Sequence, residues 1–180
     1  VPLKIEIPLV SDLGIEYVLQ VEGRADGIIA AINYDEDGNK EPESDAIIDE
    51  IKTMQTDVSL LKEPVYVHKA QALVYGYIYA SQKKLSKIGI QMTYVTPEPE
   101  TINKFLEEYT FERIEEWFNK LITGFKRWTD YTFDERHKRT ESIRELKFPY
   151  EYREGQKNLC VSVYRAIEDN TNLYIQAPTG

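Results

Sequence analysis

The first half of the chain alternates apolar and polar positions in the way that is typical of strands. Residues 1–10 predict a first strand, and residues 18–32 predict a second one that is apolar and β-branched but interrupted around two glycines. Asp26 lies at this interruption, so a carboxylate is expected inside a sheet. The acidic segment 34–45 contains Asp-Gly and a proline, and it predicts a solvated hairpin loop.

A third strand is predicted over residues 46–54, antiparallel to the strand of Asp26. Glu50 and Lys52 are two positions apart on it, so they share one face of the sheet. Antiparallel pairing then brings both side chains beside Asp26. Ordinary surface roles are the alternatives, because Asp26 alone can cap a turn and Glu50 with Lys52 can form a solvated ion pair.

Residues 66–83 contain no proline and predict a helix. His68, Gln71 and Tyr75 fall on it at i, i+3 and i+7, so they share one face. Tyr75 can instead belong to an aromatic core with the neighbouring tyrosines, and His68 can be an ordinary packed or surface histidine. The helix therefore predicts a polar and aromatic stripe that faces the strands.

The remaining pattern completes an α/β fold. Residues 87–96 predict a further strand, and near-helical spacing from residue 101 predicts one or two helices with a break at Gly124. The expected order is strand, strand, strand, helix, strand, helix, which predicts a mixed sheet flanked by helices. We expect three parts, which are a domain over residues 1–124, a helical connector over residues 125–147 and a C-terminal part over residues 148–180.

The chemistry expected beside the third strand is that of a metal site. Asp26 and Glu50 offer the hard oxygen ligands that Mg²⁺ or Mn²⁺ prefers, and the backbone carbonyl of Ile51 can supply a third ligand. A bound ion lowers the pKa of a water molecule, which Lys52 can orient or help to deprotonate. Lys52 can also offset the charge that builds up on phosphorus.

Three segments, GRADG at 23–27, DEIK at 49–52 and Gln71-x-x-x-Tyr75, resemble the PD-(D/E)xK nuclease superfamily and in particular its RecB-like exonuclease branch. The resemblance implies that Asp26 and Glu50 bind the metal, that Lys52 is the catalytic lysine, and that Gln71 and Tyr75 support the metal-bound water and the DNA strand. His68 is a further candidate for the site. The implied protein is a Mg²⁺- or Mn²⁺-dependent deoxyribonuclease acting on single strands or ends.

The superfamily usually has a helix before the first strand, and the RecB-like branch carries a His or Glu ligand on it. Here that helix is expected upstream of Val1. Glu6, Glu16 and Glu22 are the candidates for a substitute ligand, each in a strand or loop.

In the C-terminal part, Tyr-Arg-Glu-Gly-Gln at 152–156 precedes a predicted helix, and residues 172–180 predict a short buried strand that runs into Ala-Pro-Thr-Gly. This order resembles the opening of XPD/DinG-type superfamily-two helicases. The resemblance implies that Gln156 and Arg153 contribute to adenine recognition and that Thr179 and Gly180 begin a phosphate-binding loop. The lysine and Ser/Thr of such a loop are absent, so ATP binding is expected only in the full-length protein. A capped helix followed by an edge strand is the alternative.

Composition agrees with a folded cytoplasmic protein. The 180 residues are 42% hydrophobic and 12% aromatic, which is enough for a core. The one cysteine, Cys160, excludes a disulfide framework and a four-cysteine iron–sulfur cluster within the chain. The sequence contains no run of eighteen apolar residues, so no membrane association is expected.

The net charge of −9 weighs against a polyanionic partner. Residues 35–45 account for −5 of it, with six acidic residues against one lysine, while residues 126–147 carry seven basic against five acidic residues. DNA therefore remains the expected partner. The alternatives are a catalytically silent DNA-binding or docking module of a helicase, and an acidic protein-interaction domain.

Overall fold

The computed structural model describes residues 1–30, 36, 45–98, 100–144, 146–147 and 149–176. They form two units, Val1–Arg136 and His137–Gly180, and the division falls within a long helix. The first unit is a mixed α/β structure, as the sequence predicts. The second contains the end of that long helix, one further helix and extended chain. No helix in these described ranges is long and apolar enough to cross a membrane.

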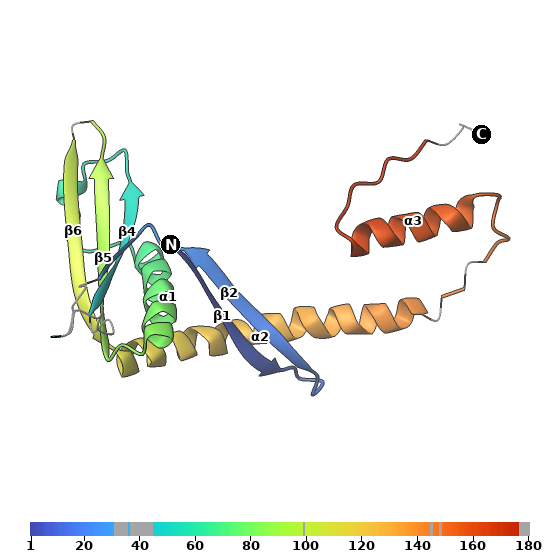
Figure 1. Ribbon diagram of the computed structural model, residues 1–180, viewed down its shortest axis with the longest axis horizontal. Helices are drawn as coiled ribbons and strands as arrows, with labels where there is room; N and C mark the ends of the chain where they lie inside the picture. Colours follow the sequence, from blue (N-terminus) through green and yellow to red (C-terminus); the bar gives the residue numbers. More distant parts are fainter. Residues whose placement is uncertain (31–35, 37–44, 99, 145, 148, 177–180) are drawn as a thin grey trace. The chain divides into compact units, whose positions relative to one another are not determined.

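A four-stranded mixed sheet forms the centre of the first unit (Figure 1). Its order is β3 (Gly27–Ala30), β4 (Ala46–Thr53), β5 (Lys87–Thr96) and β6 (Thr101–Thr110). The β4–β5 pair is parallel and the two other pairs are antiparallel. Parallel neighbours require a crossover connection. Here the crossover carries the short 3₁₀ helix η1 (Val58–Leu60) and the helix α1 (Tyr66–Lys83).

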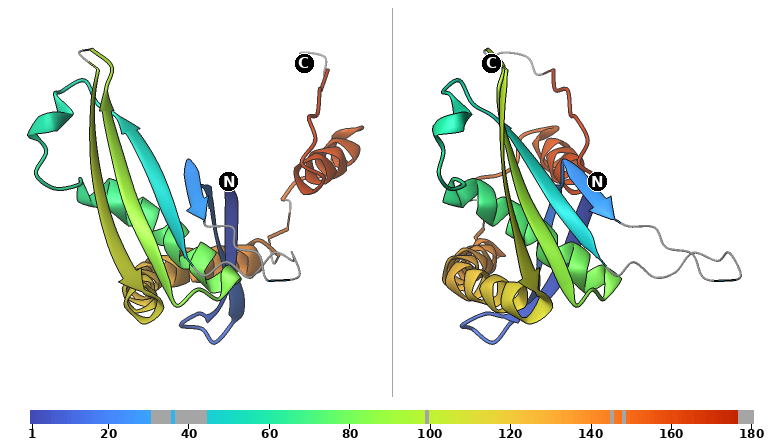
Figure 2. Two further views of the ribbon diagram at one scale, coloured as in Figure 1. Left: turned by 60° about the vertical axis from the view of Figure 1, so that its left-hand side comes forward. Right: turned by 90° about the vertical axis from the view of Figure 1, so that its left-hand side faces the viewer.

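The helix α1 packs against one face of this sheet (Figure 2). The residues of β4 that face it, Ala46, Ile48 and Glu50, are buried, and β5 is buried along most of its length. Gly76 allows the close approach, because a Cβ atom there would lie 2.5 Å from Cδ1 of Ile90. The side chains of this face are therefore enclosed between helix and sheet.

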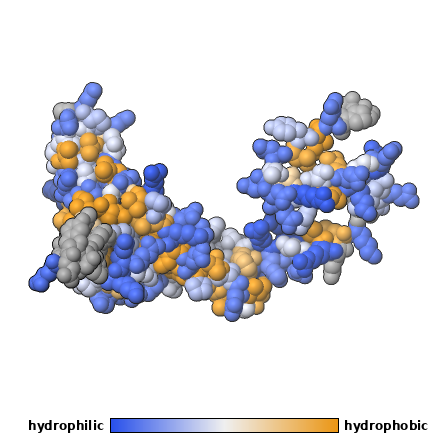
Figure 3. Space-filling view, viewed as in Figure 1, coloured by the Kyte–Doolittle hydropathy of each residue, from blue (hydrophilic) through white to orange (hydrophobic). Residues whose placement is uncertain are grey.

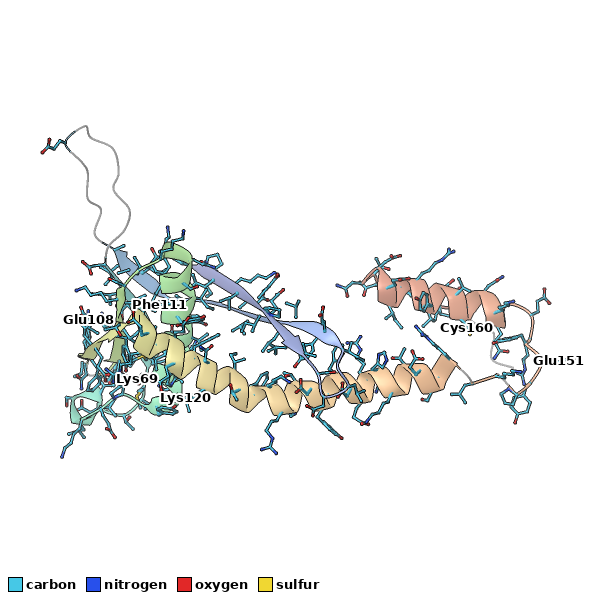
Figure 4. The ribbon with its side chains drawn as sticks, turned by 90° about the horizontal axis from the view of Figure 1, so that it is seen from below. Lys69, Glu108, Phe111, Lys120, Glu151 and Cys160 are labelled. Carbon is cyan, nitrogen blue, oxygen red and sulfur yellow. The ribbon has the colours of Figure 1, made fainter. Side chains whose placement is uncertain are left out.

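The helix α2 (Phe111–Arg144) follows β6 without a linker, and Phe111 marks the junction (Figure 4). The backbone N–H of Phe111 donates to the carbonyl of Ser86 at 2.8 Å. Further along, Phe118 stacks on Tyr77 of α1 with ring centroids 4.0 Å apart. The stacking fixes α2 against α1, and the hydrogen bond fixes the start of α2 against the turn before β5.

A separate two-stranded hairpin, β1 (Pro2–Val10) and β2 (Glu16–Arg24), packs on both helices. Tyr17 of β2 stacks on Phe133 of α2 at 4.8 Å and donates a hydrogen bond of 2.6 Å to Oδ1 of Asp130. Lys126 forms an ion pair with the other oxygen of Asp130. The Lys126 ammonium and then the Tyr17 hydroxyl lower the pKa of Asp130, whereas burial raises the pKa of Tyr17.

The prediction of one strand over residues 18–32 is wrong, because the chain changes partners at Asp26. Ala25 exchanges backbone hydrogen bonds with Val1, in the hairpin sheet. Gly27 pairs with Asp49, in the four-stranded sheet. Asp26 therefore lies at a bend between β2 and β3 rather than inside a strand. The loop predicted over residues 34–45 lies almost entirely outside the described residues.

The prediction of a helix from residue 101 is wrong for its first ten residues, which form β6. Phe105 and Tyr109 pair with Met92 and Ile88 and share their covered face, while Ile102 and Leu106 point to the opposite face. Apolar residues on both faces of a strand imitate helical spacing. The expected break at Gly124 is also wrong, since α2 continues through it.

In the second unit, α3 (Gln156–Glu168) confirms the predicted helix. It begins after Gly155, whose φ of +77° favours glycine. Its apolar side chains are exposed, and Figure 3 shows them as orange atoms at the surface. The prediction of a buried strand over residues 172–180 is wrong for residues 172–176. They are exposed, and within the described part of this unit they pair with no strand. A strand forms only against a hydrogen-bonding neighbour.

Candidate functional site

Asp26 lies beside β4 through a hydrogen bond to its backbone. Its Oδ2 atom accepts the N–H of Ile51 at 2.9 Å. The β3–β4 ladder ends with Gly27 opposite Asp49, so Ile51 lies just beyond the last pair. The carboxylate thus replaces the strand carbonyl that would otherwise accept this N–H. This bond places Asp26 next to the residue that follows Glu50.

The carbonyl of Ile51 is available on the same side. The N–H and C=O of one residue point to the same neighbouring strand. Because the N–H of Ile51 points to Asp26, its carbonyl points to that side as well, where none of the described β3–β4 pairs uses it. The expected third oxygen ligand is therefore compatible with the backbone geometry.

Glu50 is buried on the face that α1 covers, with 1% of its surface exposed. Its Oε1 atom accepts a hydrogen bond of 2.7 Å from the ammonium of Lys52. Its Oε2 atom has no hydrogen-bond partner among the described residues. A buried carboxylate oxygen without a partner is costly, and such exceptions require a cause. A cation beside Oε2 would supply the missing partner.

Lys52, Gln71 and Tyr75 form a chain of hydrogen bonds between β4 and α1. The Lys52 ammonium donates to Oε1 of Gln71 at 3.1 Å, and Nε2 of Gln71 donates to the Tyr75 hydroxyl at 3.1 Å. Gln71 therefore fixes the position of the lysine. The helix stripe and the strand pair predicted from the sequence lie together.

Tyr75 belongs both to this chain and to the core, so its two predicted roles are compatible. It is largely buried, and its ring tip lies against Gly23 of β2. A Cβ atom at Gly23 would come within 2.6 Å of the Tyr75 hydroxyl. Sequence reasoning missed this role, although a glycine inside a strand is a known sign of close approach.

His68 lies next to the chain but forms a separate contact. Its Nδ1 atom is 3.3 Å from the hydroxyl of Tyr94, which also accepts the N–H of Val65 at 2.9 Å. Tyr94 pairs with Lys52 across β4 and β5, so the two share the covered face. Burial raises the pKa of Tyr94, against the opposing effects of the Val65 N–H and of Lys52. Nothing in the sequence singled out Tyr94, because its importance comes only from strand register.

The oxygen atoms predicted to bind a metal are those of two carboxylates, Asp26 and Glu50, and the carbonyl of Ile51. Within the described ranges there is no group of three or more His, Cys, Asp or Glu residues placed to hold a metal. Glu6, Glu16 and Glu22 are exposed on the hairpin, where Glu6 pairs with Lys4 and Glu22 accepts from Gln20. No substitute ligand is therefore found among them. The donor set fits one hard cation held partly by water.

A second ion pair joins α1 to β6. Lys69 donates a hydrogen bond of 2.6 Å to Glu107 of β6, and Tyr109 donates one of 2.8 Å to the same carboxylate. These bonds lower the pKa of Glu107. The ammonium of Lys69, the hydroxyl of Tyr109 and both oxygens of Glu107 have partners, in contrast to Oε2 of Glu50. We therefore assign a structural role to these three residues.

The C-terminal candidate residues form a local turn at the start of α3. Oε1 of Gln156 accepts the N–H of Arg153 at 3.1 Å, and the carbonyl of Arg153 accepts the N–H of Gln156 at 3.1 Å. The Arg153 side chain is exposed. Thr179 and Gly180 lie outside the described residues. Adenine recognition by this part stays a prediction, as do the domain boundaries at 124/125 and 147/148.

Comparisons with known proteins give little further information. No family model matches the chain, and no curated protein matches it. A solved structure titled "Crystal structure of SSO0001" is similar, with 24% identity and a TM-score of 0.36, over 68% of this chain and 47% of that one. The chain thus spans less than half the length of that structure, and a likeness at this level carries no argument about function.

Proposed function

We propose that the unit Val1–Arg136 is a Mg²⁺- or Mn²⁺-dependent deoxyribonuclease domain that hydrolyses phosphodiester bonds. One observation carries the proposal, which is that Oε2 of the buried Glu50 has no partner among the described residues, while Lys52 bonds Oε1 and Asp26 bonds the next residue of β4. A carboxylate kept in this costly state is expected where a cation completes its coordination. The resemblance to PD-(D/E)xK nucleases of the RecB-like branch supports the same assignment.

Each side chain then has a defined role. Asp26, Glu50 and the carbonyl of Ile51 would hold the metal, which supplies an activated water and polarises a phosphate oxygen when it is bound. Lys52 places a positive charge where negative charge develops on the phosphate. Gln71 holds Lys52 in position, and Tyr75 holds Gln71. The site is thereby organised before the substrate arrives.

The substrate that we propose is DNA, as single strands or ends, and the resemblance carries this choice. We further propose that the chain belongs to a cytoplasmic helicase-nuclease. Gln156 and Arg153 would then contribute to adenine recognition when ATP binds the full-length protein. The exposed apolar side chains of α3 support this second part, because such a helix is typical of a larger domain that covers it.

The test compares Mn²⁺-dependent degradation of labelled single-stranded DNA by the wild type, Lys52→Ala and Lys87→Ala. Lys87 is the matched control, since it also lies on a strand and pairs with a carboxylate, that of Glu108, but on the opposite face of the sheet. We expect Lys52→Ala to lose roughly 10²- to 10³-fold in rate, as for other preorganised charge donors. Lys87→Ala should cleave like the wild type.

Equal cleavage by the wild type and Lys52→Ala would contradict the proposal, because the activity would then come from another site or a contaminant. If the wild type binds DNA without cleaving it, the silent DNA-binding module is the correct description.

A further inference from the structure

The hydroxyl of Tyr94 constrains the protonation state of His68. Tyr94 has no exposed surface, and its oxygen accepts the N–H of Val65 at 2.9 Å. A hydroxyl has one proton to donate and two lone pairs to accept with. The bond from Val65 uses one lone pair, so the hydroxyl proton still requires an acceptor. Leaving a buried donor without one is unfavourable.

His68 provides that acceptor. Its Nδ1 atom, at 3.3 Å, is the one acceptor within hydrogen-bond distance of Tyr94 among the described residues. Nδ1 therefore carries no proton, and the neutral imidazole carries its proton on Nε2. The buried tyrosine fixes the histidine in the Nε2–H tautomer.

The Nε2–H group of His68 has no hydrogen-bond partner among the described residues. Nδ1 contacts Tyr94 in β5 and the ring is half-buried, so Nε2–H is the ring group that is left to meet a ligand. His68 precedes Gln71 by three residues, which is a rise of about 4.5 Å along α1. Both lie on the helix face from which Gln71 bonds Lys52. The first turn of α1 contains no acidic side chain that could accept a hydrogen bond from this N–H group.

We propose that Nε2–H of His68 donates a hydrogen bond to a phosphate oxygen of the DNA strand, next to the phosphate that is cleaved. This inference rests on the proposed nuclease function and names the group that positions its substrate. A donor with a fixed tautomer beside a lysine suits an anionic oxygen, because it adds direction to the charge of the lysine. The bond forms in both the ground state and the transition state, so it affects substrate binding more than the chemical step.

The experiment measures KM and kcat for Mn²⁺-dependent cleavage of a labelled single-stranded oligonucleotide at a pH above the ordinary range of histidine. We expect His68→Phe, which keeps an aromatic ring, to raise KM about tenfold or more with kcat within about twofold of the wild type. His68→Gln, which keeps a donor near the position of Nε2, should recover most of the loss. Tyr94→Phe should raise KM less, and His68→Phe combined with Tyr94→Phe should be no worse than His68→Phe alone.

Two failures can be told apart. If the wild type cleaves and Lys52→Ala does not, but His68→Phe leaves KM unchanged or lowers only kcat, the role of His68 is wrong and the nuclease assignment stands. If the wild type and Lys52→Ala cleave equally or not at all, the proposed function fails, and this inference fails with it. Melting temperatures of all variants exclude unfolding as the cause.

Discussion

The side chains around Glu50 are held by residues far apart in the sequence, whereas those around Gln156 are held by their immediate neighbours. Asp26 bonds Ile51 across 25 positions, and Lys52 bonds Gln71 across 19. Gln156 and Arg153 are three positions apart. Both regions carry a motif that resembles a known family, but only the first is assembled by the tertiary structure.

This difference decides how much weight each resemblance has. A motif whose members come from separate strands and a helix gains support when folding brings them together. A motif confined to one turn is brought together by the helix start alone, whatever its function. The nuclease assignment can therefore be tested on this chain, whereas adenine recognition by Gln156 and Arg153 is proposed for the full-length protein.

The largest change in stability that we expect comes from adding a side chain at Gly23, where Tyr75 packs on the hairpin. Gly23→Ala would place a Cβ atom 2.6 Å from the Tyr75 hydroxyl, so the ring must move and its bond with Gln71 is lost. Such overpacking costs about 1–3 kcal/mol in the free energy of unfolding. Urea denaturation followed by tryptophan fluorescence measures the change.

Gly124→Ala is the matched control for this substitution. Gly124 lies inside α2 and has no heavy atom within 4 Å of an added Cβ. Alanine there should raise the free energy of unfolding by about 0.5–1 kcal/mol, because glycine is a poor helix former. Equal destabilisation at both glycines would contradict the close packing of Tyr75 on the hairpin.

A smaller effect is expected from removing the glutamine in each region. Gln71→Ala leaves Lys52 and Tyr75 without their shared partner and should cost about 1 kcal/mol in stability. Gln156→Ala removes one exposed hydrogen bond and should leave the main unfolding transition unchanged. Differential scanning calorimetry of both variants checks the contrast. A larger loss from Gln156→Ala would show that α3 takes part in the fold more than its exposure indicates.

The smallest effect concerns the contact of the hairpin with α2 at low pH. Lys126 and Tyr17 lower the pKa of Asp130 below its ordinary value of 3.8. A lowered carboxylate pKa contributes stability above the ordinary pKa, and this contribution is lost as the pH falls through the lowered value. The stability difference between the wild type and Asp130→Asn should therefore shrink below pH 3.8. A difference that is constant with pH would mean that the pKa of Asp130 is the same in the folded and the unfolded protein.

The local pattern of apolar and polar residues was sufficient to predict the helix and the strands that build the site. The helix predicted over residues 66–83 and the strand predicted over residues 87–96 match α1 and β5, because each has a consistent period and clear breaks. The strand with Glu50 and Lys52 is also confirmed as β4, and its face is the one that α1 covers.

The rest depends on tertiary contacts that no local pattern records. The division of residues 18–32 at Asp26 follows from a change of strand partner. The strand β6 has apolar residues on both faces and imitates a helix. The missing partner of Oε2 and the contact of His68 with Tyr94 follow from burial and register, neither of which the sequence expresses directly.

The most direct measurement is calorimetric titration of the protein with Mn²⁺ in the absence of DNA. The control is Asp49→Asn, because Asp49 neighbours Glu50 on β4 but bonds Thr93 at 2.7 Å on the opposite face. We predict that the wild type and Asp49→Asn bind one ion with similar affinity and that Glu50→Gln loses at least about tenfold, since a charged oxygen ligand is removed. Unchanged binding by Glu50→Gln, or its loss in Asp49→Asn alone, would contradict the assignment of Glu50 as a metal ligand.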